Sequence, residues 1–330
     1  MRLTFKILWF EDADDYVNDY LGPQIRRYLD EHGFDFEPII RKTGKSLDED
    51  INRQDYDLIL ADLDLKDTET GDAIIRRIRS ADVLTEVLLY SGDKTSLEKI
   101  VEKERGLQRV SFAFGRAELP DKLFRIIDLT IRKVQDINNM RGMVITEAVD
   151  IETDIESILL ENLSEESARA RVVKLLERSK ERNENKRVKL DAASLRDLVT
   201  GDFLTFHDLH DILASLVKEV LKEKRGLLAT AKGAPRAAIE ADISELGELK
   251  ECLNLMDSEV IRLRNDMAHC EQSADPETGK PMLINKKSME THDVYDDHEC
   301  MEIRKNLRKH MQKTKEIAEH LKKHRELRPR

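Results

Sequence analysis

Three polar residues near the end of one helical stretch have the types and spacing to act on a phosphodiester: Arg264, Asn265 and His269. A histidine exchanges protons near neutral pH. An arginine presents a planar fork of donors to a phosphate that gathers charge in a transition state. An asparagine can hydrogen-bond a phosphate oxygen or a 2′-hydroxyl. The combination indicates cleavage of RNA without a metal ion.

The spacing alone is weak evidence, because Arg27 and His32 are separated by the same gap elsewhere in the chain. The setting is more specific. Asn265 and His269 are four residues apart and share one face of a helix. A polar segment punctuated by Pro and Gly follows at 270–281. A helical apolar stripe precedes the motif, made of Leu253, Met256, Val260, Leu263 and Met267. This setting predicts a helix that ends at a surface, followed by a polar loop.

In this motif and its setting, the segment resembles the HEPN superfamily, all-helical domains whose ribonuclease members carry Arg-Asn-x-x-x-His. The resemblance implies attack of a ribose 2′-OH on the adjacent phosphate, which leaves a 2′,3′-cyclic phosphate and a 5′-hydroxyl. His269 would act as base or acid, Arg264 would stabilise the developing charge, and Asn265 would orient the phosphate. The resemblance also implies a homodimer with RNA as substrate and no metal in the cutting step.

The composition limits the classes of protein to which the chain can belong. Its 330 residues are enough for two domains, and 40% hydrophobic with 37% charged residues suit a soluble protein with real cores. The chain has no run of about 20 apolar residues, so no membrane span is predicted. It also lacks the pattern of a signal peptide. Its three cysteines have no metal-ligand spacing and are expected to be reduced thiols of a cytoplasmic protein.

The charge is acidic overall and unevenly spread. A formal net charge of −11 argues against a general nucleic-acid binder, and no DNA partner is expected. Basic residues gather at 303–330, where they form either a solvated helix face or a local phosphate-attracting patch. His207 and His210, three residues apart, could bind a metal on one helix face. With no Cys or further His nearby, a capping or surface role is favoured, and no zinc ligand set is recognised.

Apolar strands alternate with helical stretches over the first half of the chain. Such alternation predicts an α/β doubly wound domain, in which helices cover both faces of a parallel sheet. Helices are predicted at about 14–31, 70–80, 94–105 and from 118 onward. Strands are predicted at 3–10, 57–61, 86–90 and 109–114, with a short additional one at Ile39-Ile40.

Glu11, Asp12 and Asp62 fall at the carboxyl ends of two predicted strands. Functional groups gather at that edge of a doubly wound sheet. Three neighbouring carboxylates repel one another and have raised pKa values unless a cation lies among them. Mg²⁺ prefers hard oxygen ligands and keeps several waters. The sequence therefore predicts a magnesium site at this edge.

Over residues 1–130 the layout resembles a response-regulator receiver domain, which has a flavodoxin-like fold. The matching pieces are Trp9-Phe10-Glu11-Asp12, Leu58-Ile59-Leu60-Ala61-Asp62, Gly71-Asp72 at a helix start, and Tyr90-Ser91-Gly92. The resemblance implies that Asp62 accepts a phosphoryl group from a sensor histidine kinase. It further implies that Glu11, Asp12, Asp62 and the Asp64 backbone carbonyl hold Mg²⁺, that Ser91 hydrogen-bonds the phosphoryl oxygen, and that Phe112 moves with the switch.

The chain departs from the receiver pattern in two places. Receivers carry lysine and then proline at the end of the fifth strand, where this chain has Gly115-Arg116. Arg116 either replaces the lysine or leaves the phosphoryl group without a cation. Lys66 occupies a position often held by proline. A pseudo-receiver that is never phosphorylated is therefore the alternative for this half.

The second half, 131–330, predicts an all-α bundle without strands. An apolar stripe free of proline runs from Ile131 to Ile158, so 131–160 is expected to be a helix that connects the two domains. Such a junction either transmits movement or is a packed spacer. Further helices are expected at 203–223, 240–268 with a break near Gly247, and 298–323.

These patterns predict a receiver domain that controls a metal-independent endoribonuclease, with Mg²⁺ confined to the receiver site. The alternative is a non-catalytic two-component response regulator whose helical bundle acts as a dimerisation or partner-binding adaptor. An acidic chain with 5% aromatic residues, which has few rings on which bases can stack, supports this alternative.

Overall fold

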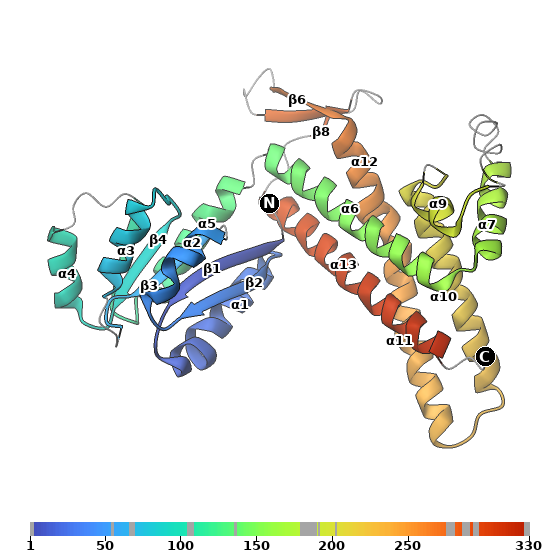
Figure 1. The fold of residues 1–330 in the computed structure, drawn as a ribbon, viewed down its shortest axis with the longest axis horizontal. Coiled ribbons are helices and arrows are strands. Elements are labelled where there is room, and N and C mark those ends of the chain that lie inside the picture. Colours follow the sequence, from blue (N-terminus) through green and yellow to red (C-terminus); the bar gives the residue numbers. More distant parts are fainter. Residues whose placement is uncertain are drawn as a thin grey trace. The chain divides into compact units, whose positions relative to one another are not determined.

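The computed structural model describes residues 3–53, 56–65, 70–103, 109–134, 137–178, 190, 192–201, 203–274, 281–285, 291–292 and 297–326. The chain divides into two compact units. Unit 1 comprises Met1–Met140 together with Asp296–Lys305, and unit 2 comprises Arg141–Tyr295 together with Asn306–Arg330. Each unit has its own architecture (Figure 1).

Unit 1 is built on a five-stranded sheet with the strand order β2-β1-β3-β4-β5. Every neighbouring pair of strands is parallel. The strands are β1 (Thr4–Phe10), β2 (Asp35–Arg41), β3 (Leu58–Asp62), β4 (Val87–Ser91) and β5 (Val110–Phe114). The helices between and after them are α1 (Gly22–Glu31), α2 (Leu47–Arg53), α3 (Gly71–Ser80), α4 (Lys94–Lys103) and α5 (Leu119–Val134). The predicted α/β doubly wound class is confirmed.

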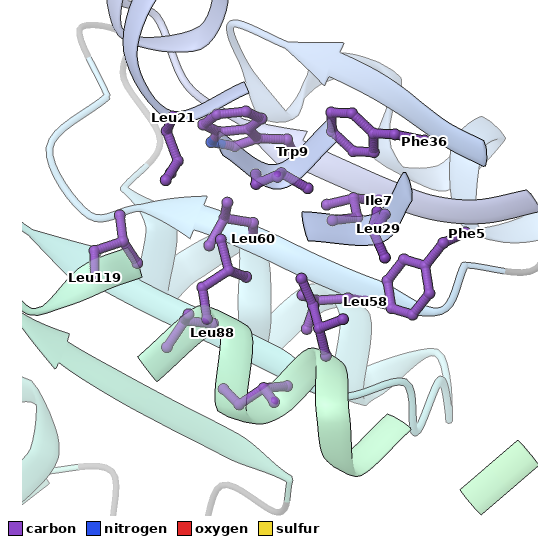
Figure 2. Close-up of a cluster of buried hydrophobic side chains, with 14 of the residues drawn as sticks. Phe5, Ile7, Trp9, Leu21, Leu29, Phe36, Leu58, Leu60, Leu88 and Leu119 are labelled. Carbon is purple, nitrogen blue, oxygen red and sulfur yellow. The ribbon is translucent and has the colours of Figure 1, made fainter. Parts of the chain in front are cut away.

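Apolar side chains leave both faces of the sheet, because successive residues of a strand point to opposite sides. On one face, Ile7, Trp9 and Leu60 pack with residues of α1 and α5 (Figure 2). On the other face, Leu8 and Ile59 pack with residues of α3 and α4. A strand buried on both faces reads as a continuous apolar run, which is why β1, β3 and β4 could be found in the sequence.

The polar parts of unit 1 were harder to predict. β2 is a full strand of seven residues rather than the short piece expected at Ile39-Ile40, since it lies at the edge of the sheet and carries charged residues. Helix α2 was not predicted, because three of its seven residues are acidic and few are apolar. A π-helical turn, η1 (Tyr16–Leu21), precedes α1.

The first residues of the last helix, α13 (Asp297–Glu326), belong to unit 1. The side chain of Arg304 is buried there. Its Nε donates to the backbone oxygen of His32 at 2.9 Å, and its guanidinium lies 4.7 Å from the centre of the Phe34 ring. Gly33 adopts a φ of 79°, and a Cβ at that position would lie 2.7 Å from the Cβ of Arg304. Arg304 is thus a packing residue and does not contribute to a basic surface patch.

Unit 2 is mostly helical. Its helices are the greater part of α6 (Ile137–Asn162), then α7 (Glu165–Arg178), α9 (Leu195–Thr200), α10 (Phe206–Leu228), α11 (Ala234–Met256), α12 (Arg262–His269) and the remainder of α13. Thr205 and Asp208 form a reciprocal capping box that fixes the start of α10. No described helix has an apolar stretch long enough to cross a membrane.

The apolar stripe of the predicted connecting segment is buried where the structure describes it. Met140, Val144, Ala148, Ile151, Ile155 and Ile158 of α6 all belong to the core. The continuity of α5 into α6 stays a prediction, because residues 135 and 136 lie outside the described residues.

Two predictions about unit 2 were wrong. α11 runs through Gly247 without a break, and the irregularity comes ten residues later as a π-helical turn, η3 (Asp257–Ile261). The segment after His269 is not simply a loop. It begins with β6 (Cys270–Ala274), which pairs with β7 (Pro281–Asn285), and β7 pairs with β8 (Thr291–His292), all antiparallel. Such short strands of mixed polarity give little periodic signal in a sequence.

Candidate functional site

Carboxylates gather at the carboxyl edge of the sheet, which we call the acid edge and define as Glu11, Asp12, Asp62 and Asp64. Glu11 directly follows β1, and Asp62 is the last residue of β3. Because β1 and β3 are parallel neighbours, with Phe10 opposite Ala61, both residues emerge at the same edge. The side chains of Glu11 and Asp62 are buried, whereas Asp64 is exposed.

A hydrogen-bonded chain of side chains holds Glu11. The indole Nε1 of Trp9 donates to the hydroxyl of Tyr90 at 2.8 Å, and that hydroxyl donates to Glu11 Oε2 at 2.7 Å. The other oxygen, Oε1, accepts from the backbone N–H of Ala13 at 3.0 Å. Both oxygens of Glu11 are thus occupied. Sequence reasoning missed this role of Tyr90, although an aromatic hydroxyl in an otherwise apolar strand was a visible signal.

Asp62 is a buried carboxyl whose charge is poorly compensated. The pKa of Asp62 is raised from its usual 3.8 to about 6, first by burial and then by the charges of Glu11 and Asp64. A hydrogen bond from the backbone N–H of Asp64 to Asp62 Oδ1 at 3.0 Å and the charge of Arg116 lower this pKa. Burial, rather than the expected repulsion between carboxylates, is thus the main cause of the raised pKa of Asp62.

The backbone approaches Asp62 closely at Gly71, the first residue of α3. A Cβ at this position would lie 2.3 Å from the backbone oxygen of Asp62, a distance that forces some atom to move. The N–H of Gly71 donates to the carbonyl of Leu63 at 3.2 Å. Glycine is therefore required here for close contact between α3 and the end of β3.

Ser91, the last residue of β4, lies beside Asp64. Its hydroxyl donates to Asp64 Oδ2 at 2.6 Å and accepts from the backbone N–H of Asp93 at 2.9 Å. The structure thus brings Asp62, Asp64 and Ser91 into one hydrogen-bonded group. Phe112 of β5 is half-buried against the core on the α3 and α4 face, and Lys66 lies outside the described residues.

Arg116, which was expected either to replace the receiver lysine or to leave the site without a cation, stacks on an aromatic ring. Its guanidinium lies 4.3 Å from the centre of the Tyr16 ring. Burial raises the pKa of Tyr16 to about 12, although Arg116 opposes this shift. Because the charge of Arg116 also lowers the pKa of Asp62, the guanidinium acts electrostatically on the acid edge while its plane covers Tyr16.

Carboxylates and a backbone carbonyl are the donors that suit Mg²⁺, so the chemistry of the acid edge fits this cation. The ligand atoms of the acid edge lie farther apart than the sequence suggested. Among the described residues, the sets of three donors whose ligand atoms lie within 4.8 Å of one another are found in unit 2 and not at this edge. The physical reason is that Tyr90 and Ala13 hold both oxygens of Glu11.

The Arg-Asn-His motif, which we define as Arg264, Asn265 and His269, lies on α12 in unit 2. Asn265 and His269 are exposed, and His269 is the last residue of the helix. Nη1 of Arg264 donates to Asn265 Oδ1 at 3.0 Å. Its Nη2 lies 3.6 Å from Oε2 of Glu152 on α6, and burial raises the pKa of Glu152 against the opposing charge of Arg264.

A second arginine, not recognised in the sequence, lies close to the motif. Nη2 of Arg141 on α6 donates to the backbone oxygen of Ala268 at 3.3 Å. Arg141 therefore adds a cation beside the residue that precedes His269. An arginine one helix away in space but 127 positions earlier in the chain gives no local sequence signal.

Three basic residues of α13 pair with acids in unit 2. Lys309 pairs with Glu259 at 2.6 Å, Lys313 pairs with Glu316 at 2.7 Å, and Arg325 binds Glu161. Each acid offsets one positive charge on the helix surface. The ion pairs therefore favour the interpretation of 303–330 as a solvated helix face.

The chain is similar to several solved structures. The receiver domain of the Francisella response regulator 1452 is 21% identical, covering 39% of this chain and 99% of its own, with a TM-score of 0.31. A sensor protein from Polaromonas sp. JS666 is 21% identical over 39% of this chain and 97% of its own, with a TM-score of 0.31. Full-length FixJ from B. japonicum is 15% identical over 62% of this chain and 93% of its own, with a TM-score of 0.32.

No family model matches this chain, and no curated protein does. Similarities at these identities and TM-scores carry no argument about activity. The class of unit 1 rests on its own strand order and parallel pairing, which define a flavodoxin-like doubly wound fold. The acid edge lies at the carboxyl ends of the strands, where ligands of this fold class bind.

Proposed function

We propose that unit 1 is a receiver domain of a two-component response regulator, and that Asp62 accepts a phosphoryl group from a sensor histidine kinase. The observation that carries this proposal is the buried Asp62 at the end of β3, within a hydrogen-bonded group that includes Asp64 and Ser91. A carboxylate with few compensating contacts is a nucleophile that needs little desolvation before it attacks phosphorus.

Each residue of the acid edge has a definite part in this reaction. Asp62 Oδ2 attacks the phosphorus in line with the leaving group, while Oδ1 stays bound to the N–H of Asp64. The hydroxyl of Ser91 turns from Asp64 to a phosphoryl oxygen. Glu11, Asp12, Asp62 and the Asp64 backbone carbonyl would hold Mg²⁺, which would supply positive charge to offset the phosphoryl oxygens.

Arg116 is the point at which this site differs from the receiver pattern. To meet a phosphoryl oxygen, its guanidinium must leave the ring of Tyr16, and a cation–π contact of this kind is worth about 0.5–2 kcal/mol. A charge-assisted hydrogen bond to the phosphoryl group compensates for that loss. The alternative, a pseudo-receiver, keeps Arg116 on Tyr16 permanently.

We further propose that unit 2 is a HEPN-type endoribonuclease that acts as a homodimer. The motif and its place at an exposed helix end support this proposal. The ion pair between Arg264 and Glu152 is long and partly exposed, so exchanging it for a phosphate costs little. His269 then moves the proton of the 2′-hydroxyl or of the leaving oxygen, and Asn265 orients the phosphate.

A second candidate function, an adaptor that only dimerises or binds a partner, is favoured by two observations. The net charge is −11, and Lys309 and Lys313 of α13 are paired with acids. Neither feature attracts RNA over a distance. An adaptor requires no exposed histidine at the end of α12, so overexpression of wild type and His269→Ala discriminates the two. A nuclease arrests growth and its variant does not, whereas an adaptor shows no difference.

Mass spectrometry of the ends of cleaved RNA tests the ribonuclease proposal. The purified full chain, incubated with RNA in EDTA, is expected to leave 2′,3′-cyclic phosphate and 5′-hydroxyl ends. Ends with a 3′-hydroxyl and 5′-phosphate, or activity only with added metal, would contradict the proposed chemistry. Labelling with acetyl phosphate tests unit 1, since Asp62→Asn is expected to abolish it. No labelling of wild type would favour the pseudo-receiver.

A further inference from the structure

A compact group of side chains on α10 lies apart from both sites described above. It consists of His207, His210 and Asp211, whose ligand atoms all lie within 4.8 Å of one another. Nε2 of His207 is 3.8 Å from one oxygen of Asp211, and Nδ1 of His210 is 3.4 Å from the other. Two imidazoles and a carboxylate form a donor set typical of transition-metal sites.

The hydrogen bonds of His210 fix which of its nitrogens is free. Its side chain is buried, and Nε2 lies 2.8 Å from the backbone oxygen of Leu253. A carbonyl oxygen can only accept, so Nε2 carries the hydrogen and Nδ1 holds a lone pair. Nδ1 has no hydrogen-bond partner although it is buried. In the neutral ring this lone pair faces an oxygen of Asp211 at 3.4 Å, an arrangement that a metal ion bound to both atoms would stabilise.

His207 is oriented in the complementary way. Its Nδ1 lies 3.1 Å from Oδ1 of Asp257, the first residue of η3, so Nδ1 carries the hydrogen and Nε2 faces Asp211. The second oxygen of Asp257 is 2.8 Å from Nη2 of Arg262, so both oxygens of this carboxylate have a partner. A metal-ligating histidine typically donates its other N–H to a carboxylate or a backbone carbonyl. Both histidines follow this pattern, because His207 donates to the carboxylate of Asp257 and His210 donates to the backbone carbonyl of Leu253.

We propose that His207 Nε2, His210 Nδ1 and the Asp211 carboxylate bind a divalent transition metal, with Zn²⁺ as the ion that best matches three N and O ligands. The fourth position is open to water. Asp257 and the Leu253 carbonyl are positioning groups that hold the two rings. Because they belong to η3 and α11, the ion ties α10 to the π-helical turn that directly precedes α12.

Another set of donors in unit 2, Asp242, Glu245 and His320, is equally close but differs in one respect. Asp242 is already bound by the ammonium of the buried Lys224 at 2.6 Å, and His320 Nε2 lies 3.2 Å from Glu245. A lysine at this place supplies the positive charge that a metal would bring and repels one. His320 is therefore a matched control for His207.

The test uses the metal-free full chain, titrated with Zn²⁺ against a colorimetric chelator in excess Mg²⁺, which keeps the acid edge occupied. One Zn²⁺ per chain is expected. His207→Ala and Asp211→Asn, both at exposed positions that leave the core intact, are expected to weaken binding at least about 100-fold. Asp257→Asn is expected to weaken it about 10–100-fold. His320→Ala should bind as wild type does. Bound Co²⁺ should show the intense visible absorption of a four-coordinate site.

Two results would overturn the proposal. Absence of Zn²⁺ uptake by wild type would mean that a proton on His210, and not a metal, bridges it to Asp211. Equal affinity of wild type, His207→Ala and Asp211→Asn would place the bound ion elsewhere in the chain. Circular dichroism of each variant in the metal-free state separates loss of the site from loss of the fold.

Discussion

The acid edge is assembled from the ends of two strands, β1 and β3, whereas the Arg-Asn-His motif stands on one short helix. Glu11 is held by Tyr90 and Ala13, and Asp62 by the backbone of Asp64, so the positions of these carboxylates are fixed by the sheet itself. Arg264 has one partner on its own helix and one on α6. The first site is preorganised, and the second keeps side chains that a ligand can still reorient.

This difference explains why changes in the two sites should have different consequences. At the acid edge, Glu11 and Asp62 are buried in unit 1, so their substitution should alter stability as well as the proposed chemistry. At the motif, exposed side chains contribute little to folding, so their substitution should remove activity alone.

The largest expected effect is on RNA cleavage. Arg264→Ala and His269→Ala are each expected to lower the cleavage rate by about 10²–10³-fold or more, because one removes a charge stabiliser and the other a proton carrier. Thermal unfolding and the dimer should be unchanged. The matched controls are Arg236→Ala and His298→Ala, which alter exposed residues of the same types elsewhere. A wild-type rate in either motif variant would refute the assignment.

Substitution of two glycines by alanine compares a closely packed position, Gly71, with one that has free space around it, Gly142. Gly71→Ala places a Cβ against the backbone of Asp62, so it should destabilise unit 1 by about 1–3 kcal/mol and reduce labelling by acetyl phosphate. Gly142→Ala, in α6 with no neighbouring atom within 4 Å, should stabilise unit 2 by about 0.5–1 kcal/mol. Circular dichroism during thermal unfolding measures both. Equal effects of the two would show that α3 does not fix Asp62.

Removing one hydroxyl tests the hydrogen-bonded chain beneath the acid edge. Tyr90→Phe leaves the indole N–H of Trp9 and a buried oxygen of Glu11 without a partner, at an expected cost of about 1–3 kcal/mol. Trp9 is the one tryptophan of the chain, so its fluorescence during denaturant unfolding reports on unit 1 alone. Tyr20→Phe, at an exposed position, serves as control. A variant as stable as wild type would mean that water replaces the hydroxyl.

The smallest expected effect concerns pH. Folding raises the pKa of Asp62 from 3.8 to about 6, so the folded state binds more protons in this window. The stability of unit 1 should therefore fall as pH rises through the window, by on the order of 1–2 kcal/mol without divalent cations. Asp62→Asn should not show this loss, and Mg²⁺ should reduce it in wild type. Trp9 fluorescence measures each case, and identical pH profiles would contradict the prediction.

The sequence predicted the site residues that lie at strand ends. It did not predict the contacts between residues far apart in the chain. Glu11, Asp62 and Ser91 follow apolar runs, so their convergence could be deduced from parallel pairing alone. Glu152 and Arg141 reach the Arg-Asn-His motif from α6, and Arg304 packs on the loop before β2 from the other end of the chain. Such contacts are set by helix packing, which leaves no local pattern.

The cluster of His207, His210 and Asp211 could also be predicted only in part from the sequence. His207 and His210 were visible at helical spacing, and Asp211 was their direct neighbour. What marks the site is the tautomer of each ring, and this depends on Leu253 and Asp257, more than forty positions away. Residue types identified the candidates, and only their acceptors show which nitrogens are free.

The two proposals together predict that phosphorylation of Asp62 controls the cleavage of RNA by Arg264 and His269. The most direct test measures the rate of RNA cleavage by the full chain with and without acetyl phosphate, in wild type and in Asp62→Asn. The ratio of the two rates should differ from one in wild type, in either direction, and equal one in Asp62→Asn. A ratio that is the same in both proteins would contradict the account, because acetyl phosphate would then act elsewhere or not at all.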